Sequence, residues 1–307
     1  MTETTRLIVG RGLLGRSIER VRSTPQVRVR VPWDDPQGSV LALRAGVAEL
    51  AAHDGDLELY WSAGRGVTST PAAQLEIEGD VFARTIAALS DLPAAVRGRL
   101  TVFLASSVGG AYAGSARPPF SESTATAATS AYGETKLRME HTLRDATTTG
   151  DWRSFIARIT NVYGAGQDLA KPQGLISALV RGHLSQQPIA VYVPLDTLRD
   201  YIYEDDCAAV VDAAMRRLRE EPTGSTVVKV VGSMRAVSIG ALLSELTRLR
   251  RRRGPIVLGG GDATGQSLDL RVRSEVWSDL DALARTTLPE GLSRVYQAQL
   301  TGRTNPR

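Results

Sequence analysis

The chain contains very little cysteine, histidine and lysine. Its 307 residues include one cysteine, Cys207, three histidines and, among 37 basic residues, only the lysines Lys136, Lys171 and Lys229. One cysteine cannot form an internal disulfide, and three scattered histidines do not build a Cys/His zinc site. These shortages exclude a disulfide-stapled or zinc-stabilised domain and predict a reducing, cytoplasmic location.

Long apolar runs and a large net charge are missing as well. No stretch approaches the ~20 apolar residues that a membrane span needs, and Leu7–Val9 is too short for the core of a signal peptide. The formal net charge is +4, and the densest cluster of arginines, at positions 248 and 250–253, ends a predicted amphipathic helix. Cations suit that end of a helix dipole. We therefore expect neither a membrane nor a nucleic-acid partner.

The hydrophobic content of 42% and the charged content of 23% are those of an ordinary globular protein. Strand-like and helix-like segments alternate over the first two-thirds, which predicts an α/β fold with a doubly wound, Rossmann-type parallel sheet. We expect residues 1–165 to form mainly this domain. Residues 166–307 should form mainly a smaller α/β substrate-binding region, with segments at about 200–235 returning to the sheet. The predicted strands are Arg6–Val9, Val27–Val31, Leu57–Trp61, Leu100–Ala105 and Phe155–Ile159, and the helices are Leu13–Arg22, Val40–Ala52, Gln74–Leu89 and Ala131–Ala146.

The first predicted strand runs into a glycine-rich turn. Gly10, Gly12 and Gly15 have the spacing G-x-G-x-x-G and precede a segment with helical apolar periodicity. In that context the first glycine permits a tight turn, the second lets backbone N–H groups approach a pyrophosphate, and the third lets helix and strand pack closely. The motif predicts a dinucleotide site. Its expected contacts are Gly10, Arg11, Gly12, Leu13, Leu14 and Gly15.

The second predicted strand carries arginine where NAD-binding proteins usually place an acid. That acid follows the glycine turn by ~20 residues and holds the ribose 2′-hydroxyl. Here the strand contains Arg28 and Arg30, the turn adds Arg11, and acids follow only at Asp34 and Asp35. Because arginines can pair with a 2′-phosphate, the residues favour NADP(H), with Arg30 as a cofactor contact. NAD(H) fits instead if the chain curls back so that Asp34 reaches the ribose.

Two serines, a tyrosine and a lysine form the second chemical pattern. Ser106 and Ser107 follow the fourth predicted strand, and Tyr132 and Lys136 lie four residues apart on one face of the predicted helix 131–146. Doubly wound folds bind ligands at this carboxyl edge of the sheet. A phenol, with a pKa of ~10, exchanges a proton near pH 7 only if its anion is stabilised, and an ammonium one turn away supplies that field. The pattern predicts interconversion of a carbonyl and an alcohol.

In combination these motifs resemble the extended short-chain dehydrogenase/reductase family, the NAD-dependent epimerase/dehydratase group that acts mostly on nucleotide sugars. The resemblance also includes R-I-T-N-V-Y-G at 158–164 and L-R-D-Y-I-Y-E-D-D at 198–206. It implies a homodimer in which the helices 74–89 and 131–146 pair across a two-fold axis.

The resemblance also implies roles for individual residues. Tyr132 and Lys136 correspond to the catalytic pair, which also contacts the cofactor, and Ser107 corresponds to the hydroxyl at the strand end. Asn161 corresponds to a substrate contact, and Arg199 to the arginine that meets a sugar-nucleotide phosphate. A bidentate guanidinium suits that task, although an ion pair between Arg199 and an aspartate stays open as a structural alternative.

The chain departs from the family pattern at three places. Val9 stands where the first of three glycines is usual, so that Gly10 takes over the turn. The tyrosine after Ser107 comes one residue later than usual, so Ser106 competes with Ser107 as the active hydroxyl and is expected at the substrate. Val108–Gly109 replaces the Asp-Glu pair of 4,6-dehydratases, which removes the side chains that elimination needs.

These observations favour a ketoreductase that acts on a nucleotide-linked sugar, with NADPH as hydride donor and Tyr132 as proton donor. The same residues would serve an NAD-dependent nucleotide-sugar epimerase, which takes hydride and returns it to the other face. A hypothesis from another class is a non-catalytic dinucleotide sensor, which the presence of both Tyr132 and Lys136 disfavours.

Overall fold

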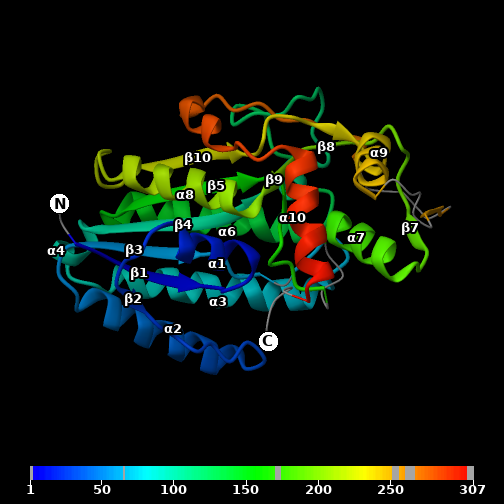
Figure 1. Ribbon diagram of the computed structural model, residues 1–307. Helices are drawn as coiled ribbons and strands as arrows, with labels where there is room; N and C mark the ends of the chain where they lie inside the picture. Colours follow the sequence, from blue (N-terminus) through cyan, green and yellow to red (C-terminus); the bar gives the residue numbers. More distant parts are fainter. Residues whose placement is uncertain (1–2, 65, 170–173, 251–255, 260–266, 303–307) are drawn as a thin grey trace.

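A six-stranded, all-parallel sheet lies at the centre of the computed structural model, which describes residues 3–64, 66–169, 174–250, 256–259 and 267–302 (Figure 1). The strand order is β10-β5-β4-β3-β1-β2. This arrangement confirms the predicted doubly wound parallel sheet. The strands are β1 (Thr4–Val9), β2 (Gln26–Val27), β3 (Asp56–Trp61), β4 (Leu100–Ser107), β5 (Arg153–Ile159) and β10 (Thr226–Val231).

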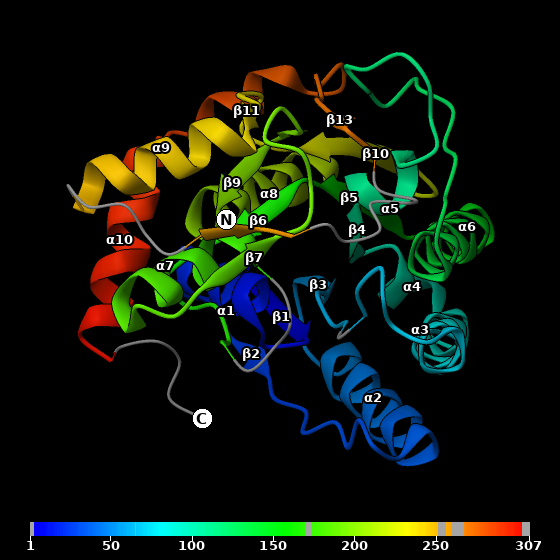
Figure 2. The ribbon, with the colours of Figure 1, turned by 90° about the vertical axis from the view of Figure 1, so that its right-hand side faces the viewer.

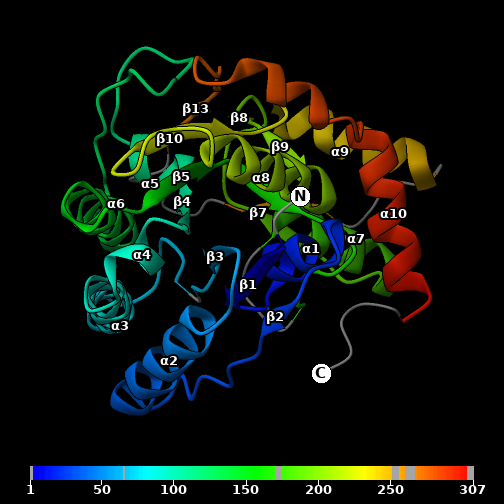
Figure 3. The ribbon, with the colours of Figure 1, turned by 90° about the vertical axis from the view of Figure 1, so that its left-hand side faces the viewer.

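Helices cover both faces of the sheet. On one face α2, α3 and α6 pack over a core that includes Leu43, Phe82 and Met139. On the other face α1 and α8 pack over a core that includes Ile18 and Val211. Figure 3 shows the two groups of helices on opposite sides of the strands. The bounds are α1 (Leu13–Val21), α2 (Pro36–Ala51), α3 (Ala72–Ser90), α6 (Ala131–Gly150) and α8 (Glu204–Leu218).

The C-terminal half builds a smaller region beyond the carboxyl ends of the strands (Figures 1 and 2). Its helices share a third core that includes Leu179, Leu242 and Leu292. The helices are α7 (Leu175–Ser185), α9 (Ile239–Arg250) and α10 (Leu288–Leu300), and the strands are β6 (Asn161–Tyr163), β7 (Ile189–Val191), β8 (Leu198–Arg199), β9 (Tyr201–Tyr203), β11 (Val237–Ser238), β12 (Ile256–Leu258) and β13 (Asp269–Leu270). Short helices also occur at α4 (Ala94–Arg97), α5 (Val108–Tyr112) and η1 (Ser278–Leu283).

The predicted strand Val27–Val31 is wrong in its extent, since β2 covers only Gln26–Val27. It lies at the edge of the sheet and pairs only with β1, at two positions. The segment beyond β2 leaves the sheet before Pro32, which cannot donate a ladder hydrogen bond. Arginines 251–253 of the arginine cluster and Lys171 lie outside the described residues.

Two of the helices on the face of the sheet that α3 covers begin at a residue whose side chain caps them. The Asp35 carboxylate accepts a hydrogen bond from the Gln37 amide, so α2 begins at Pro36 rather than at the predicted Val40. The Ser130 hydroxyl accepts one from the Gly133 amide and starts α6 one residue before Tyr132. This cap places Tyr132 in the first turn of α6, close to the end of β4.

Candidate active site

The glycine turn between β1 and α1 leaves open space beside the N-terminus of α1. Gly10 has a φ of +88°, and a Cβ on it would lie 2.3 Å from the Ala63 backbone. A Cβ on Gly15 would lie 2.1 Å from the Gly10 carbonyl oxygen, whereas a Cβ on Gly12 would meet nothing within 4 Å. No side chain caps α1. The first amide groups of α1 are therefore available to an anion, and the space at Gly12 fits a pyrophosphate.

A cavity of about 150 Å³ continues from this turn. Trp33 lines it and stands at right angles to the buried Trp61, with ring centroids 6.4 Å apart. A cavity that offers apolar side chains and one arginine beside a free helix N-terminus suits the adenosine end of a dinucleotide. The lining residues are Leu7, Ile8, Val9, Gly10, Arg11, Val29, Val31 and Trp33. Of the other two predicted loop contacts, Leu14 packs into the α8 core and Leu13 lies near Gly166.

One arginine and no carboxylate line this cavity, and that arginine is paired with a nearby acid. Nη2 of Arg11 lies 2.6 Å from Oε2 of Glu19, and Nη2 of Arg28 lies 2.5 Å from Oε1 of the same carboxylate. The two arginines lower the pKa of Glu19 although its partial burial opposes this. Arg30 is exposed and makes no hydrogen bond or ion pair with the described residues, and Asp34 is exposed outside the cavity wall.

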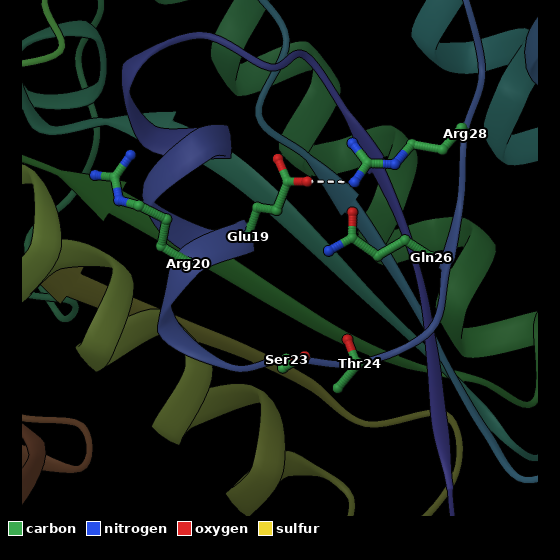
Figure 4. Close-up of a pocket in the computed structure, with 6 residues that line it drawn as sticks. All are labelled: Glu19, Arg20, Ser23, Thr24, Gln26 and Arg28. Atoms are coloured by element: carbon green, nitrogen blue, oxygen red, sulfur yellow. Dashed lines mark hydrogen bonds and ion pairs between the residues drawn. The ribbon is translucent and has the colours of Figure 1, made fainter.

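A second, larger hollow of about 430 Å³ lies on the other side of Glu19 and is shown in Figure 4. Glu19 and Arg28 join across its upper rim, while Arg20 turns away toward Asp205, which its Nη2 approaches to 2.8 Å. Polar side chains line this hollow: Glu19, Arg20, Ser23, Thr24, Gln26 and Arg28. It contains none of the predicted catalytic residues.

Tyr132, Lys136 and Ser107 meet at the carboxyl end of β4. Nζ of Lys136 lies 5.8 Å from the centroid of the Tyr132 ring. A Cβ placed on Gly110 would lie 3.3 Å from Cβ of Ser107 and 3.4 Å from Cε1 of Tyr132, so both side chains border the same small space. Ser107 and the Tyr132 ring thus border one space, and the Lys136 ammonium lies beside the same ring.

The two adjacent serines are placed differently. The Ser106 hydroxyl is buried and donates to Oε1 of Glu140 at 2.5 Å. Arg158 binds the same carboxylate through Nε and Nη2, at 3.1 and 2.7 Å from its oxygens. Ser107 is half-buried and its hydroxyl accepts from the Gly110 amide at 3.1 Å, which leaves its proton free for a substrate oxygen. Because successive strand residues face opposite ways, only one of these serines can border Tyr132.

Sequence reasoning missed a carboxylate in this site. Oε1 of Glu78, on α3, lies 3.1 Å from Nζ of Lys136, and the side chains are 14% and 7% exposed respectively. Burial alone would lower the pKa of Lys136, but the Glu78 carboxylate outweighs it and raises that pKa. No pattern in the sequence pointed to Glu78, because the expected pairing of helices 74–89 and 131–146 lies between two copies, whereas this contact lies within one chain.

Two further predicted residues lie on the other side of the carboxyl edge. Asn161 starts β6, is exposed, and its side-chain amide donates to the Asp200 carbonyl at 2.9 Å. Arg199 ends β8 and donates to the Leu198 carbonyl at 2.9 Å. The guanidinium of Arg199 has no ion pair with the described residues, and its burial lowers its pKa. The Asp269 carboxylate acts on this guanidinium only at longer range, without a direct ion pair among the described residues.

Neither a metal cluster nor a membrane helix was found within the residues that the structure describes. No group of three or more His, Cys, Asp or Glu side chains there is arranged to hold a metal ion. No helix in the same part of the chain is both long and apolar enough to cross a bilayer.

A family model described as "NAD dependent epimerase/dehydratase family" matches residues 63–230, which is more than half of the chain. The chain belongs to this family. The match begins just after β3 and includes Ser107, Tyr132, Lys136 and Asn161. The glycine turn precedes the matched residues and is not part of them. The predicted resemblance to this group is confirmed.

Curated relatives in this family include both epimerases and reductases. The chain is 35% identical over 112 residues to a dTDP-L-rhamnose 4-epimerase of Burkholderia thailandensis, a match that covers 36% of this chain and 30% of the relative. It is 31% identical over 140 residues to a dTDP-4-dehydro-6-deoxyglucose reductase of Escherichia coli, covering 46% of this chain and 43% of the relative. The matches thus span less than half of each relative.

Solved structures share the whole fold. A UDP-glucose 4-epimerase from Brucella ovis in complex with NAD superposes with a TM-score of 0.79 at 18% identity and covers 96% of this chain and 98% of its own. RMD from Pseudomonas aeruginosa complexed with NADPH gives a TM-score of 0.75 at 20% identity, covering 98% of this chain and 100% of its own. At such low identity the likeness establishes the fold of the chain, including its C-terminal region.

Proposed function

We propose that the protein is a nicotinamide-dependent oxidoreductase that reduces a keto carbon of a nucleotide-linked sugar. The observation that carries the proposal is the meeting of Ser107, Tyr132 and Lys136 at the edge of the sheet onto which the glycine turn opens. The dTDP-sugar reductase and epimerase among its relatives support this substrate class.

Each of the three residues has a distinct task in the reaction. A bound nicotinamide cofactor would supply the hydride that reduces the carbonyl carbon. Ser107 donates a hydrogen bond to the carbonyl oxygen and orients it. Tyr132 gives its phenolic proton to that oxygen as the alcohol forms, and the Lys136 ammonium stabilises the phenolate that remains. We assign the hydroxyl role to Ser107 because the Ser106 hydroxyl already binds Glu140.

NADP(H) is the cofactor that we propose. The residues that line the adenosine cavity include Arg11 and no carboxylate, and the exposed Arg30 has no ion pair with the described residues. A 2′-phosphate could pair with Arg30, and with Arg11 by displacing the Glu19 carboxylate, whereas no carboxylate among the lining residues would hold a ribose 2′-hydroxyl. Similar folds bind either dinucleotide, as the NAD and NADPH complexes illustrate, so the proposal rests on these arginines.

The nucleotide part of the substrate is proposed to bind at Arg199. A partly buried guanidinium that has no direct carboxylate partner among the described residues favours an anion, and a diphosphate can accept its hydrogen bonds in a bidentate manner. Asn161 lies on the neighbouring strand pair β6–β9 and exposes its side chain at the same edge of the sheet. We propose that it contacts the sugar.

An epimerase is the second candidate, favoured by the identity of 35% to the rhamnose epimerase. Such an enzyme would retain its dinucleotide through purification and would need no net supply of reductant. A reductase would consume free NADPH in stoichiometric amounts with product. Measuring both quantities on the purified protein separates the two candidates.

We also propose that the protein is a cytoplasmic homodimer. Helices α3 and α6 pack against one another and present a common outer surface, on which Ile77 is 46% exposed. The proposal follows the resemblance to the family, and Ile77 is a position on this surface at which it can be tested. Ile77→Asp should convert a dimer into monomers in sedimentation velocity; a monomeric native protein would overturn this proposal.

The decisive experiment compares the native protein with Tyr132→Phe. A thermal-shift panel of NAD(H), NADP(H) and nucleoside diphosphates identifies ligands because they raise the melting temperature of the native state. Turnover of a dTDP- or UDP-linked 4-keto sugar with NADPH should fall by about 10²- to 10⁴-fold in Tyr132→Phe, while the thermal shift by NADPH is kept. Unchanged turnover in this variant would overturn the catalytic assignment.

A further inference from the structure

We propose that Glu78 is a positioning residue that holds the Lys136 ammonium, in its charged form, beside Tyr132; this inference rests on the proposed function. Glu78 and Lys136 come from different helices, α3 and α6, and are separated by 58 positions in the chain. Their contact is a hydrogen-bonded ion pair of 3.1 Å between largely buried side chains. Burying these two charged groups costs desolvation free energy, and their hydrogen bond fixes the orientation of both side chains.

The loop after β3 encloses this ion pair. Gly64 has a φ of +154°, and a Cβ on it would lie 3.0 Å from Oε1 of Glu78 and 3.3 Å from Nζ of Lys136. A Cβ on Gly66 would lie 3.4 Å from Cδ2 of Tyr132 and 3.7 Å from Oε2 of Glu78. The phenol, the ammonium and the carboxylate therefore converge under two glycines, where a side chain would intrude.

Few other charges act on Lys136 within the described part of the chain. Tyr132, on α6 itself, is the second titratable group that acts on its ammonium, and strand β4 contributes the neutral Ser107. One turn further along α6, the Glu140 carboxylate is bound by Arg158 and Ser106 rather than by Lys136. Glu78 is thus the carboxylate that pairs with Lys136 among these residues.

This pairing has a chemical consequence. A buried lysine without a partner loses its proton at lower pH, because burial disfavours the charged form. An uncharged amine could no longer stabilise the phenolate of Tyr132. By keeping the lysine charged, Glu78 extends the pH range of proton donation to higher pH.

The scarcity of lysine makes a direct test practical. Protein grown on lysine labelled with ¹³C at Cε has three lysine resonances, from Lys136, Lys171 and Lys229, and Lys136→Arg identifies the signal of interest. In Glu78→Gln the Lys136 signal should titrate at least about one pH unit lower than in the native protein. Glu76→Gln removes the same charge from an exposed position of the same helix and is the matched control.

Activity measurements supply the second readout. In Glu78→Gln the alkaline limb of the rate profile should move to lower pH, and a shift of about one pH unit gives about a fivefold loss at the pH where the native enzyme keeps half of its activity. Glu78→Asp should restore part of the active pH range. If Glu78→Gln does not fold, Glu78→Asp takes its place in both measurements. Equal titration curves and rate profiles in Glu78→Gln and Glu76→Gln would overturn the inference while leaving the proposed function intact. A shifted lysine titration in a protein without turnover would overturn the proposed function alone.

Discussion

The Ser106 hydroxyl donates to Oε1 of Glu140 at 2.5 Å, well below the surface of the protein. Glu140 is 1% exposed and also binds the Arg158 guanidinium, whose third nitrogen donates to the Tyr112 hydroxyl. Burial raises the pKa of Tyr112 even though Arg158 opposes this. The polar groups next to the proposed site are thus bound to one another in a closed network.

Replacing the two serines should separate stability from turnover. Ser107→Ala should lower kcat by about a hundredfold or more, because it removes a hydrogen bond that strengthens as charge develops on the substrate oxygen. Ser106→Ala should lower the free energy of unfolding by about 1–3 kcal/mol, because a buried carboxylate loses a donor, and should leave kcat nearly unchanged. Urea denaturation and steady-state kinetics measure the two effects. A larger loss of kcat in Ser106→Ala would contradict the assignment of Ser107.

Two glycines of the turn provide a matched pair for cofactor binding. Gly12 has a φ of −80°, which alanine adopts freely, and its missing Cβ faces open space. Gly12→Ala should therefore melt like the native protein but lose most of its thermal shift with NADPH. Gly15→Ala places a Cβ against the Gly10 carbonyl, and this overpacking should cost about 1–3 kcal/mol of stability. Retained cofactor binding in Gly12→Ala would argue against this cradle.

A third prediction concerns the anion site at Arg199. Arg199→Met should weaken binding of a nucleoside diphosphate by about ten- to a hundredfold, the loss expected for a charge-assisted hydrogen bond. Arg44→Met is the control, since Nη2 of Arg44 pairs with Oδ2 of Asp91 at 3.1 Å on the surface, away from Arg199. Isothermal titration calorimetry with dTDP and UDP would measure both. Equal affinities in the two variants would remove Arg199 from the proposed substrate site.

The free energy of unfolding at alkaline pH should depend on Tyr201. Burial raises the pKa of Tyr201 to about 12, with Arg199 opposing the shift, whereas an unfolded tyrosine has a pKa of ~10. The folded state retains this proton while the unfolded state loses it, so the stability is full below pH ~10 and falls as the pH rises toward 12. Tyr201→Phe should reduce the slope of unfolding free energy against pH in this window. An identical slope in the variant would show that other groups determine it.

The sequence predicted the sheet well because its strands are short apolar runs that alternate with amphipathic helices. The structure confirms the doubly wound architecture, and most predicted helices and strands end within a few residues of their observed limits. The smaller strands β6, β8 and β9 were not predicted. Each has two or three residues and forms only through pairing with distant segments, so local periodicity carries no sign of it.

The candidate site, like the fold, could be predicted only where its pattern is local in the sequence. The glycine turn and the Tyr132–Lys136 spacing are local patterns, and both could be read in the sequence. Glu78 reaches Lys136 only because α3 packs along α6, and the choice between Ser106 and Ser107 depends on which face of β4 meets Glu140. Those relationships are tertiary, and no spacing within one segment encodes them.

Helix α6 carries Tyr132, Lys136 and Glu140 at intervals of four residues, so that they form one row along its length. The last of the three is anchored to two neighbouring strands by Ser106 and Arg158. Sliding or rotating the helix would therefore break charged contacts in the protein interior before it displaced the phenol. On the mechanism that we propose, the phenol and the ammonium are thus arranged before any ligand binds, and little binding energy is needed to order them.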